Sequence, residues 1–515
     1  MRRALALALL PLAAAAADGP LLSPQEEAGR LIYTQGRSPS GAELRGLVGQ
    51  EGTAVPAEAV TCAGCHGDDG LGRPEGAVEP SVITWSKLTT PYGVTHGAGR
   101  SHPPYDEKAV ARAITAGVDP AGNTLDWTMP RYSMPAEDVR ALVAYLKRLE
   151  TRSDPGITQA SVRLGTVLPD RGRLAPTGLA LRAVLEGFLA DVNGEGGING
   201  RRLLLEVAGY DSDAGDGLAE ARRLVEGGRV TALLSPYAPG AERALRELAE
   251  AARIPVVGPF TPLTPPRPGT HVFYVVAGIG EQARALAEHL ARAPGGGRVA
   301  LLHAREEPLE EAARAARAQL AARGGGEPLV RSFPGGRLEP ALARRLAASG
   351  VKRLLFLGGD ADLSTLLRAC AGAGFAPQVL VPGVLVSGAI AGAPPDFRGG
   401  LLVAYPTGPA DERPAAATRF ARMQGPSRAE PRLRGAQVSA YASAAALAEA
   451  LRRTGRNLSR ERLLKSLEGL VEYDTGLAPR LTFGPGRRVG VQGAHLVAVD
   501  PRARTLSPVG FQRAD

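Results

Sequence analysis

The sequence predicts two folded domains, a small N-terminal domain bounded by helices and a larger C-terminal domain of two α/β lobes with parallel sheets. A helix-start signal stands at Ser23, and an amphipathic stretch at 136–149 closes the first domain. Beyond it, short apolar runs alternate with helical stretches, the pattern of a parallel sheet covered by helices on both faces. With 515 residues, each domain can bury its own core.

The N-terminus has the composition of a secretory signal peptide. A short basic region, Met1-Arg2-Arg3, precedes an apolar run that becomes alanine-rich before Asp18. We place the signal peptide at 1–17, the first domain at 18–150, a polar linker at 151–157 and the second domain at 158–515. The apolar run is short for a membrane span, so we expect an exported, periplasmic protein with no membrane-spanning segment in the mature chain.

The charge balance does not indicate a nucleic-acid partner. The chain has 61 Lys and Arg against 52 Asp and Glu, a net charge of +9. The basic residues are mostly arginines scattered among acids on alanine- and glycine-rich stretches, without aromatic residues placed for base stacking. We interpret them as a solvated surface, part of which can steer an acidic redox partner.

The strongest functional motif is Cys62-Ala63-Gly64-Cys65-His66. Two cysteines at this spacing can bond the two vinyl groups of one porphyrin, and the histidine that follows can ligate the iron. A zinc site would need a second ligand pair, but the remaining cysteine, Cys370, is far along the chain. A glycine- and aspartate-rich loop follows the motif, where a thioredoxin-like dithiol would have a long helix. The motif predicts one covalent haem c and redox chemistry.

Two helices are expected to frame this domain. Ser23 as N-cap, Pro24 at the first helical position and Glu26 at the third predict a helix that ends near Gly36. The stretch 136–149 carries an apolar stripe, which we expect to pack on the first helix and on the haem edge. The stripe consists of Val139, Leu142, Val143, Leu146 and Leu149.

Residues 23–150 resemble the class I c-type cytochromes. The resemblance rests on residues 29–33, the haem motif with Gly67, Met129-Pro130, and the closing run 142–147. It implies an all-helical fold, with His66 as the proximal iron ligand and a methionine near the last helix as the distal one. Such a site passes electrons and does not need an open iron position, so we expect an electron carrier and no enzyme.

Two methionines could be the distal ligand. We favour Met129, which lies in a loop that can fold over the porphyrin, above Met134, where the next residue can begin the helix. If both were packing residues, His96 or His102 would have to supply the ligand.

The resemblance also implies a carbonyl partner for the second nitrogen of His66. A proline carbonyl downstream of the motif has this role in the family, and Pro80 is the nearest match. Trp85 is expected either near a haem propionate or in the core.

The second domain should contain two lobes of similar build. We predict strands at 162–168, 203–207, 230–234 and 254–257 with helices at 178–193, 215–226 and 241–252, then strands at 299–302 and 354–357 with helices at 281–293 and 308–323. Cys370 falls on a further helical stretch, and we expect it to be a buried structural thiol.

This domain resembles the type I periplasmic solute-binding proteins, in particular the Leu/Ile/Val receptors. The resemblance is carried by a first strand that ends at Leu168-Pro169, by the run 193–201, by residues 210–212, and by residues 254–257. It implies ligand contacts at the carboxyl ends of strands. The implied contacts are Asp170 and Arg171, Ser235 and Tyr237, Phe260 and Thr261, and His303 or Asp360 in the second lobe.

One loop departs from the amino-acid receptors. Residues 235–240 contain Pro236 and Pro239, each of which removes an amide donor that could hold a ligand carboxylate. The departure weakens the case for an amino-acid ligand.

The combination gives two functional hypotheses. In the first, the chain is an exported electron carrier that accepts electrons from a periplasmic dehydrogenase, passes them to the respiratory chain, and carries a ligand-binding domain. In the second, it is a solute receptor of an ABC-type transport or sensing system, and the haem domain is accessory.

Overall fold

The computed structural model describes most of the chain. The described residues are 22–72, 78–96, 99–149, 154–265, 268–292, 297–386, 388, 390, 392–425 and 430–514. The predicted signal peptide, residues 1–17, lies outside them, as do residues 151–153 of the predicted linker. The chain divides into two compact units, Met1–Thr158 and Gln159–Asp515.

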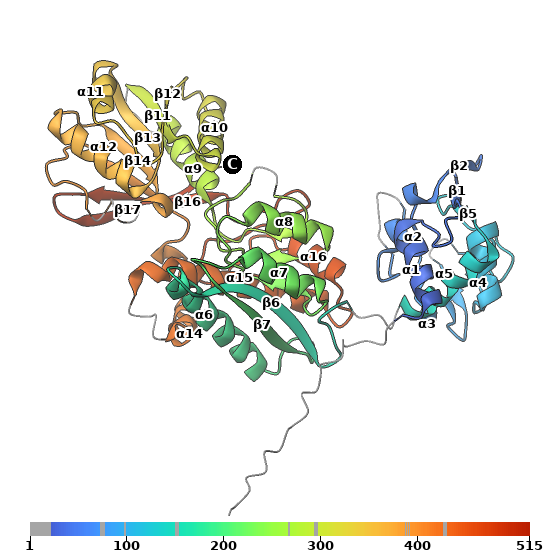
Figure 1. Ribbon diagram of the computed structural model, residues 1–515. Helices are drawn as coiled ribbons and strands as arrows, with labels where there is room; N and C mark the ends of the chain where they lie inside the picture. Colours follow the sequence, from blue (N-terminus) through green and yellow to red (C-terminus); the bar gives the residue numbers. More distant parts are fainter. Residues whose placement is uncertain are drawn as a thin grey trace, which may run out of the picture. The chain divides into compact units, whose positions relative to one another are not determined.

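The first unit has a helical core with a small antiparallel sheet (Figure 1). Its helices are α1 (Pro24–Gln35), α2 (Cys62–His66), α3 (Trp85–Leu88), α4 (Glu107–Ala116) and α5 (Ala136–Leu149). Its strands are β1 (Arg45–Val48), β2 (Thr53–Pro56), β3 (Val94–Thr95), β4 (Ser101–His102) and β5 (Arg131–Ser133). The sheet has the order β2-β1-β5, and β3 pairs with β4. The sequence did not reveal these short strands.

Helix α1 begins and ends at the predicted residues. The Ser23 hydroxyl accepts a hydrogen bond from the Glu26 amide at 3.3 Å, and the Glu26 carboxylate accepts one from the Ser23 amide at 2.7 Å. Gly36 ends the helix with a φ of 67°, a conformation that costs glycine little. This capping box confirms the predicted helix start.

Helices α1 and α5 cross at Gly29. A Cβ atom at Gly29 would lie 2.0 Å from the carbonyl oxygen of Ala141 and 2.7 Å from the Cβ of Tyr145. Next to the crossing, the rings of Tyr33 and Tyr145 are 5.4 Å apart. The whole apolar stripe predicted on the last helix is buried. The predicted packing of the first helix on the last is therefore confirmed.

The first lobe of the second unit has a five-stranded parallel sheet with the order β10-β9-β8-β6-β7. Figure 1 labels β6 and β7 of this sheet and the helices α6 and α7 beside them. Its strands are β6 (Ser161–Arg171), β7 (Arg202–Asp211), β8 (Ala232–Leu234), β9 (Val256–Val257) and β10 (Val272–Phe273). Its helices are α6 (Ala175–Gly194), α7 (Gly217–Glu226) and α8 (Glu242–Ala251). These elements agree with the predicted alternation of strands and helices.

The second lobe has a seven-stranded sheet with the order β12-β11-β13-β14-β15-β16-β17. The strands are β11 (Arg298–Ala304), β12 (Leu329–Phe333), β13 (Val351–Leu357), β14 (Gln378–Pro382), β15 (Leu401–Tyr405), β16 (Gly493–Asp500) and β17 (Thr505–Arg513). The pairings from β12 to β15 are parallel, and β16 and β17 add an antiparallel edge that the sequence did not reveal. Its helices are α9 (Ile279–Arg292), α10 (Glu307–Ala322), α11 (Ala341–Ala348) and α12 (Asp360–Gly372).

After β15 the chain returns to the first lobe. It forms α14 (Pro414–Met423), α15 (Arg434–Thr454) and α16 (Arg460–Glu468), and α15 packs into the core of the first lobe beside α6. Cys370 on α12 is buried as predicted, and burial raises the pKa of its thiol to about 12. No helix in the described part of the chain combines the length and the apolar character needed to cross a bilayer.

We predict that Gly29→Ala destabilises the first unit by about 1–3 kcal/mol, because the added methyl group meets backbone atoms of α5. Denaturant unfolding of the full chain, followed by circular dichroism, measures the loss. Gly280→Ala in α9 is the matched control, since nothing lies within 4 Å of its Cβ position. Equal stability of Gly29→Ala and the wild type would contradict this helix crossing.

A second prediction concerns Glu250, whose carboxylate joins α8 to the start of β10. It accepts hydrogen bonds from the amides of Thr270 and His271 at 2.7 and 2.8 Å and from their side chains at 2.8 Å. Burial alone would raise its pKa, but the hydrogen bonds from His271 and Thr270 outweigh burial and lower the pKa to about 2. Because the folded pKa is depressed, this stabilisation is present above 4.5, the value for the free side chain, and is lost as the pH falls towards 2.

Accordingly, Glu250→Gln should lower the free energy of unfolding by about 1–2 kcal/mol near neutral pH, a figure reduced for solvent screening, and flatten its acid dependence. Unfolding curves measured from neutral to acidic pH test this expectation. Glu247→Gln on the same helix is the control, since Glu247 pairs with the exposed Arg243. A wild-type acid dependence retained in Glu250→Gln would refute the assignment.

Candidate functional site

The first unit contains a cavity of about 1010 Å³. This volume is at the upper end of the range for cofactor sites, about 300–1,000 Å³. Much of its wall is apolar, and it includes Tyr33, Val110, Ala113, Ile114, Leu142 and Leu146. Folded interiors contain few voids larger than a water molecule, so a cavity of this size is suited to a large apolar group.

The predicted haem-binding residues line this cavity together. Cys62, Cys65 and His66 come from the single short helix α2, and Met129 comes from the loop before β5. Thr61 caps α2, because its hydroxyl accepts a hydrogen bond from the Gly64 amide at 3.2 Å. The motif therefore has a fixed helical conformation at the cavity wall.

The carbonyl directly after the motif is held by α1. The buried hydroxyl of Tyr33 donates a hydrogen bond to the carbonyl oxygen of Gly67 at 2.6 Å. Gly67 ends α2 with a φ of 76°. The position of the motif is thus tied to the helix crossing described above.

His66 has a defined hydrogen-bond partner. Its Nδ1 lies 2.9 Å from the carbonyl oxygen of Ser81, so Nδ1 carries the proton and Nε2 keeps its lone pair for a metal. Burial lowers the pKa of His66 and favours the neutral imidazole, whereas the bond to Ser81 acts in the opposite direction. The predicted partner, Pro80, was wrong by one residue. The carbonyl oxygen of Pro80 instead lies against Gly72, where an added Cβ atom would be 2.4 Å from it.

The two methionines occupy different places. Met129 lines the cavity, whereas Met134 packs against the hydrophobic core of the first unit. The loop that carries Met129 is fastened by Arg131, whose guanidinium donates to the carbonyls of Leu125, Asp126 and Met129. Sequence reasoning missed this role of Arg131, although a cation directly after Met129-Pro130 was a visible signal.

His96 and His102 also line the cavity, and their Nε2 atoms are 3.0 Å apart. Trp85 does not appear in the cavity wall and packs against the core, with the ammonium of Lys147 5.3 Å from its ring centre. Of the two positions expected for Trp85, the structure shows the one against the core.

In the second unit, the structure brings some of the predicted ligand contacts together. The rings of Tyr237 and Phe260, which follow β8 and β9, are 5.1 Å apart with an edge-on geometry. The Thr261 hydroxyl lies 3.3 Å from the carboxylate of Glu242. Ser235 is 1% exposed and has a φ of 46°, which is unusual for a residue with a side chain.

Other predicted contacts do not join this group. The carboxylate of Asp170 lies over Gly209 of β7, on the side of β6 away from β8, and Arg171 is 3.8 Å from it. His303 is in β11 of the second lobe, and Asp360 begins α12 there.

The backbone donors beside the aromatic pair are already used. The amide of Tyr237 donates to the carbonyl of Val167 at 2.8 Å, and that of Phe260 donates to Pro236 at 2.9 Å. Together with the two prolines, these bonds leave few donors for a ligand carboxylate.

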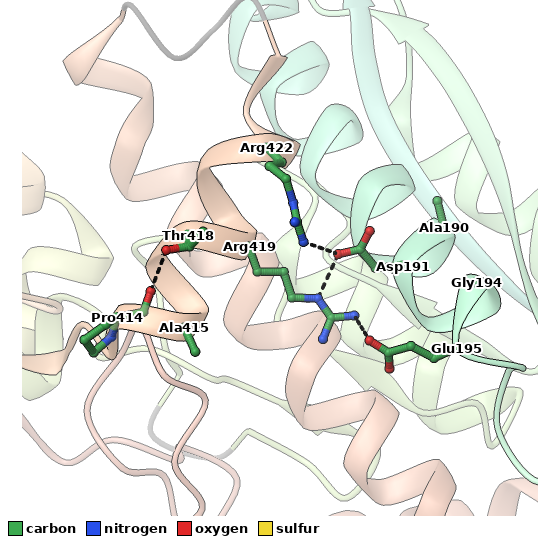
Figure 2. A pocket seen from close by; sticks show the side chains of 9 residues that line it. All are labelled: Ala190, Asp191, Gly194, Glu195, Pro414, Ala415, Thr418, Arg419 and Arg422. Atoms are coloured by element: carbon green, nitrogen blue, oxygen red, sulfur yellow. Dashed lines mark hydrogen bonds and ion pairs between the residues drawn. The ribbon is translucent and has the colours of Figure 1, made fainter.

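A second hollow, of about 700 Å³, lies between α6 and α14 (Figure 2). Its charged side chains pair with one another: Arg419 is 2.9 Å from Asp191 and 3.3 Å from Glu195, and Arg422 is 3.6 Å from Asp191. The hollow is an open surface feature whose charges are mutually neutralised, so we assign no ligand to it.

Sequence comparison agrees with both halves of this architecture. A family model described as periplasmic binding protein matches residues 161–504. The chain belongs to the periplasmic binding protein family. A model described as cytochrome c matches residues 50–150, so the first unit is a cytochrome c domain. No curated protein sequence matches the chain.

Solved structures resemble the binding-protein domain. A fatty acid ABC transporter substrate-binding protein from Thermomonospora curvata has a TM-score of 0.55 at 17% identity, covering 71% of this chain and 95% of that one. A branched chain amino acid ABC transporter protein from Thermus thermophilus with bound valine has a TM-score of 0.52 at 20% identity, and the match covers 69% of this chain and 97% of that one. A leucine binding protein from Thermotoga maritima has a TM-score of 0.52 at 17% identity, and the match covers 68% of this chain and 99% of that one. At these identities the likeness shows the fold.

The residues of the cytochrome c domain fit a covalent haem. Two thiols, an imidazole with a free Nε2 and a thioether line one largely apolar cavity, and this donor set is the one that haem c requires. The aromatic pair and the engaged amides of the binding-protein domain fit an apolar ligand surface better than a carboxylate site.

Proposed function

We propose that this chain is an exported c-type cytochrome that transfers electrons through one covalently bound haem and also carries a ligand-binding domain. The observation that carries the proposal is the joint lining of one cavity by Cys62, Cys65, His66 and Met129.

Each of these residues has a separate role in the proposal. The sulfurs of Cys62 and Cys65 would form the thioether links to the porphyrin, and His66 and Met129 would hold the iron. Haem c, when bound, supplies reversible one-electron chemistry at its iron. A thioether is a soft, weak ligand that favours ferrous iron, so Met129 raises the reduction potential above that of a two-histidine site.

The partners in the proposal are periplasmic redox proteins. A dehydrogenase would donate electrons, and a component of the respiratory chain would accept them. The net charge of +9 favours encounter with acidic partners, an effect that weakens as the salt concentration rises.

We expect Met129→Ala to lower the reduction potential and to remove the weak near-infrared band of a sulfur–iron bond, because water or another ligand would replace the thioether. Met134→Ala should change neither, since Met134 packs in the core. Potentiometric titration and near-infrared absorption of the purified holoprotein measure both effects. Loss of the band in Met134→Ala with its retention in Met129→Ala would reverse the ligand assignment.

Covalent attachment has its own test. Cys62→Ala or Cys65→Ala should weaken haem retention, because each removes one of the two thioether links. Haem staining after denaturing electrophoresis measures it, and Cys370→Ala, a buried thiol in the other unit, is the control. A wild-type protein that holds no haem after maturation with the attachment machinery would refute the electron-transfer proposal.

A second candidate function is that of a solute receptor in an ABC-type transport or sensing system. The family assignment favours it, as does the likeness of about 70% of the chain to transporter-associated binding proteins. In this case the cytochrome c domain is accessory, and the strand-end group of Tyr237, Phe260 and Thr261 contributes to ligand binding.

Thermal unfolding of the full chain with candidate solutes tests the receptor function. A true ligand at a hundredfold excess over its Kd should stabilise the binding-protein domain by about 2.7 kcal/mol, and Tyr237→Ala should abolish this effect. Leucine and valine should leave the unfolding temperature unchanged, because the amides beside the aromatic pair are engaged. Stabilisation by either amino acid would show that a carboxylate is accepted after all.

A further inference from the structure

A cluster of charged and polar side chains lies on the wall of the haem cavity, on elements other than α2. It contains His96, Arg100 and His102 from the β3–β4 hairpin and Asp119 from the loop after α4. Nη1 of Arg100 is 2.8 Å from Oδ2 of Asp119, and Nη2 of Arg100 is 3.0 Å from Nε2 of His96. The first three of these residues line the cavity.

Asp119 holds Arg100, and each of its carboxylate oxygens already accepts two hydrogen bonds. Its side chain is fully buried. Oδ1 accepts hydrogen bonds from the amides of Ala121 and Asn123 at 2.9 Å, and Oδ2 accepts them from Asn123 at 3.0 Å and from Arg100. Asp119 therefore neutralises one cation and anchors it in a defined position.

Several further charged side chains lie near His96 and the cavity wall. Burial and the nearby cations Arg100 and Lys87 lower the pKa of His96, whereas Asp119 acts in the opposite direction. Arg112 adds a further cation by donating to the main-chain carbonyl of Asp119 at 2.7 Å. Among the described residues that line the cavity, Arg100 and Lys87 are basic, and Glu79 and Asp126 carry carboxylates. Arg100 therefore lies on a wall of mixed charge, and the N–H groups that it does not use for Asp119 and His96 can hold an anion.

Hydrogen bonds also hold the two histidines beside Arg100. Arg100 can only donate, so Nε2 of His96 accepts from it. Nδ1 of His102 is 2.8 Å from the carbonyl oxygen of Pro103 and donates to it, and Nε2 of His102 is 3.0 Å from Nε2 of His96.

We propose that Arg100, held by Asp119 and flanked by His96 and His102, binds the carboxylate edge of the haem and sets its reduction potential. A haem carries its vinyl groups and its carboxylates on different edges. The helix α2 fixes the vinyl edge through Cys62 and Cys65, so the carboxylate edge faces another part of the wall. In the described part of the cavity wall, this cluster offers an arginine that the buried Asp119 holds in place and that has N–H groups left to donate. The inference rests on the proposed haem site.

The sign of the potential shift tests the role of the cluster. A cation near the iron disfavours the oxidised state, so Arg100→Gln should lower the midpoint potential and Asp119→Asn should raise it. We expect Arg100→Gln to change the equilibrium constant for reduction by about tenfold, which is about 59 mV for a one-electron couple. Arg100→Lys keeps the charge and should restore most of the potential.

The matched control is Arg37→Gln, which also removes one cation from an ion pair, the one with Glu58, and lies outside the cavity wall. It should leave the potential unchanged. The propionate bending vibrations in the resonance Raman spectrum should shift in Arg100→Gln and stay in Arg37→Gln, because only the former loses a donor to the carboxylates.

Each outcome decides the proposal. If a haem-loaded Arg100→Gln protein has the midpoint potential and the propionate vibrations of the wild type, the role of Arg100 is overturned. The proposed electron-transfer function would then still stand. If Arg100→Gln fails to retain haem, Asp119→Asn and Arg100→Lys still decide by the sign of their shifts, and shifts of the same sign and size would overturn it. A wild-type chain without haem would instead overturn the proposed function and this inference together.

Discussion

The crossing of α1 and α5 is the contact on which the haem site depends. The absence of a side chain at Gly29 lets the helices approach until main chain meets main chain at Ala141. This approach buries Tyr33, whose hydroxyl holds the carbonyl that follows the cysteine motif. The two ends of the cytochrome c domain thus position its middle, and α2, a helix of 5 residues, could not hold its own orientation without them.

Main-chain carbonyls do much of the positioning around the cavity. Ser81 orients the His66 ring, and carbonyls of the loop that carries Met129 receive the Arg131 guanidinium. Such partners depend on the path of the chain and not on residue type. This explains how a loop rich in glycine and proline, with little regular structure, can still present ligands in fixed positions.

The binding-protein domain illustrates a different constraint, which is that the carboxyl ends of parallel strands lie at one edge of the sheet. Tyr237 and Phe260 meet because β8 and β9 are neighbours, whereas Asp170 lies near the end of β6, with its carboxylate over Gly209 of β7. The amides that could receive an anion here are used within the lobe. The domain therefore has the periplasmic binding protein fold, and at these strand ends the amides of Tyr237 and Phe260 bond within the lobe.

The sequence by itself determined the two domains, the capped first helix, the last helix, the alternating strands and helices, and the motif at Cys62, because each rests on neighbours a few residues apart. It also favoured Met129, although it left Met134 open. Only the tertiary structure decided that Ser81 and not Pro80 contacts His66, that Arg131 fastens the Met129 loop, that β16 and β17 complete the second sheet, and that Arg100 meets Asp119 and His96 at the cavity. These contacts join residues through turns and crossings, whose paths local patterns do not specify.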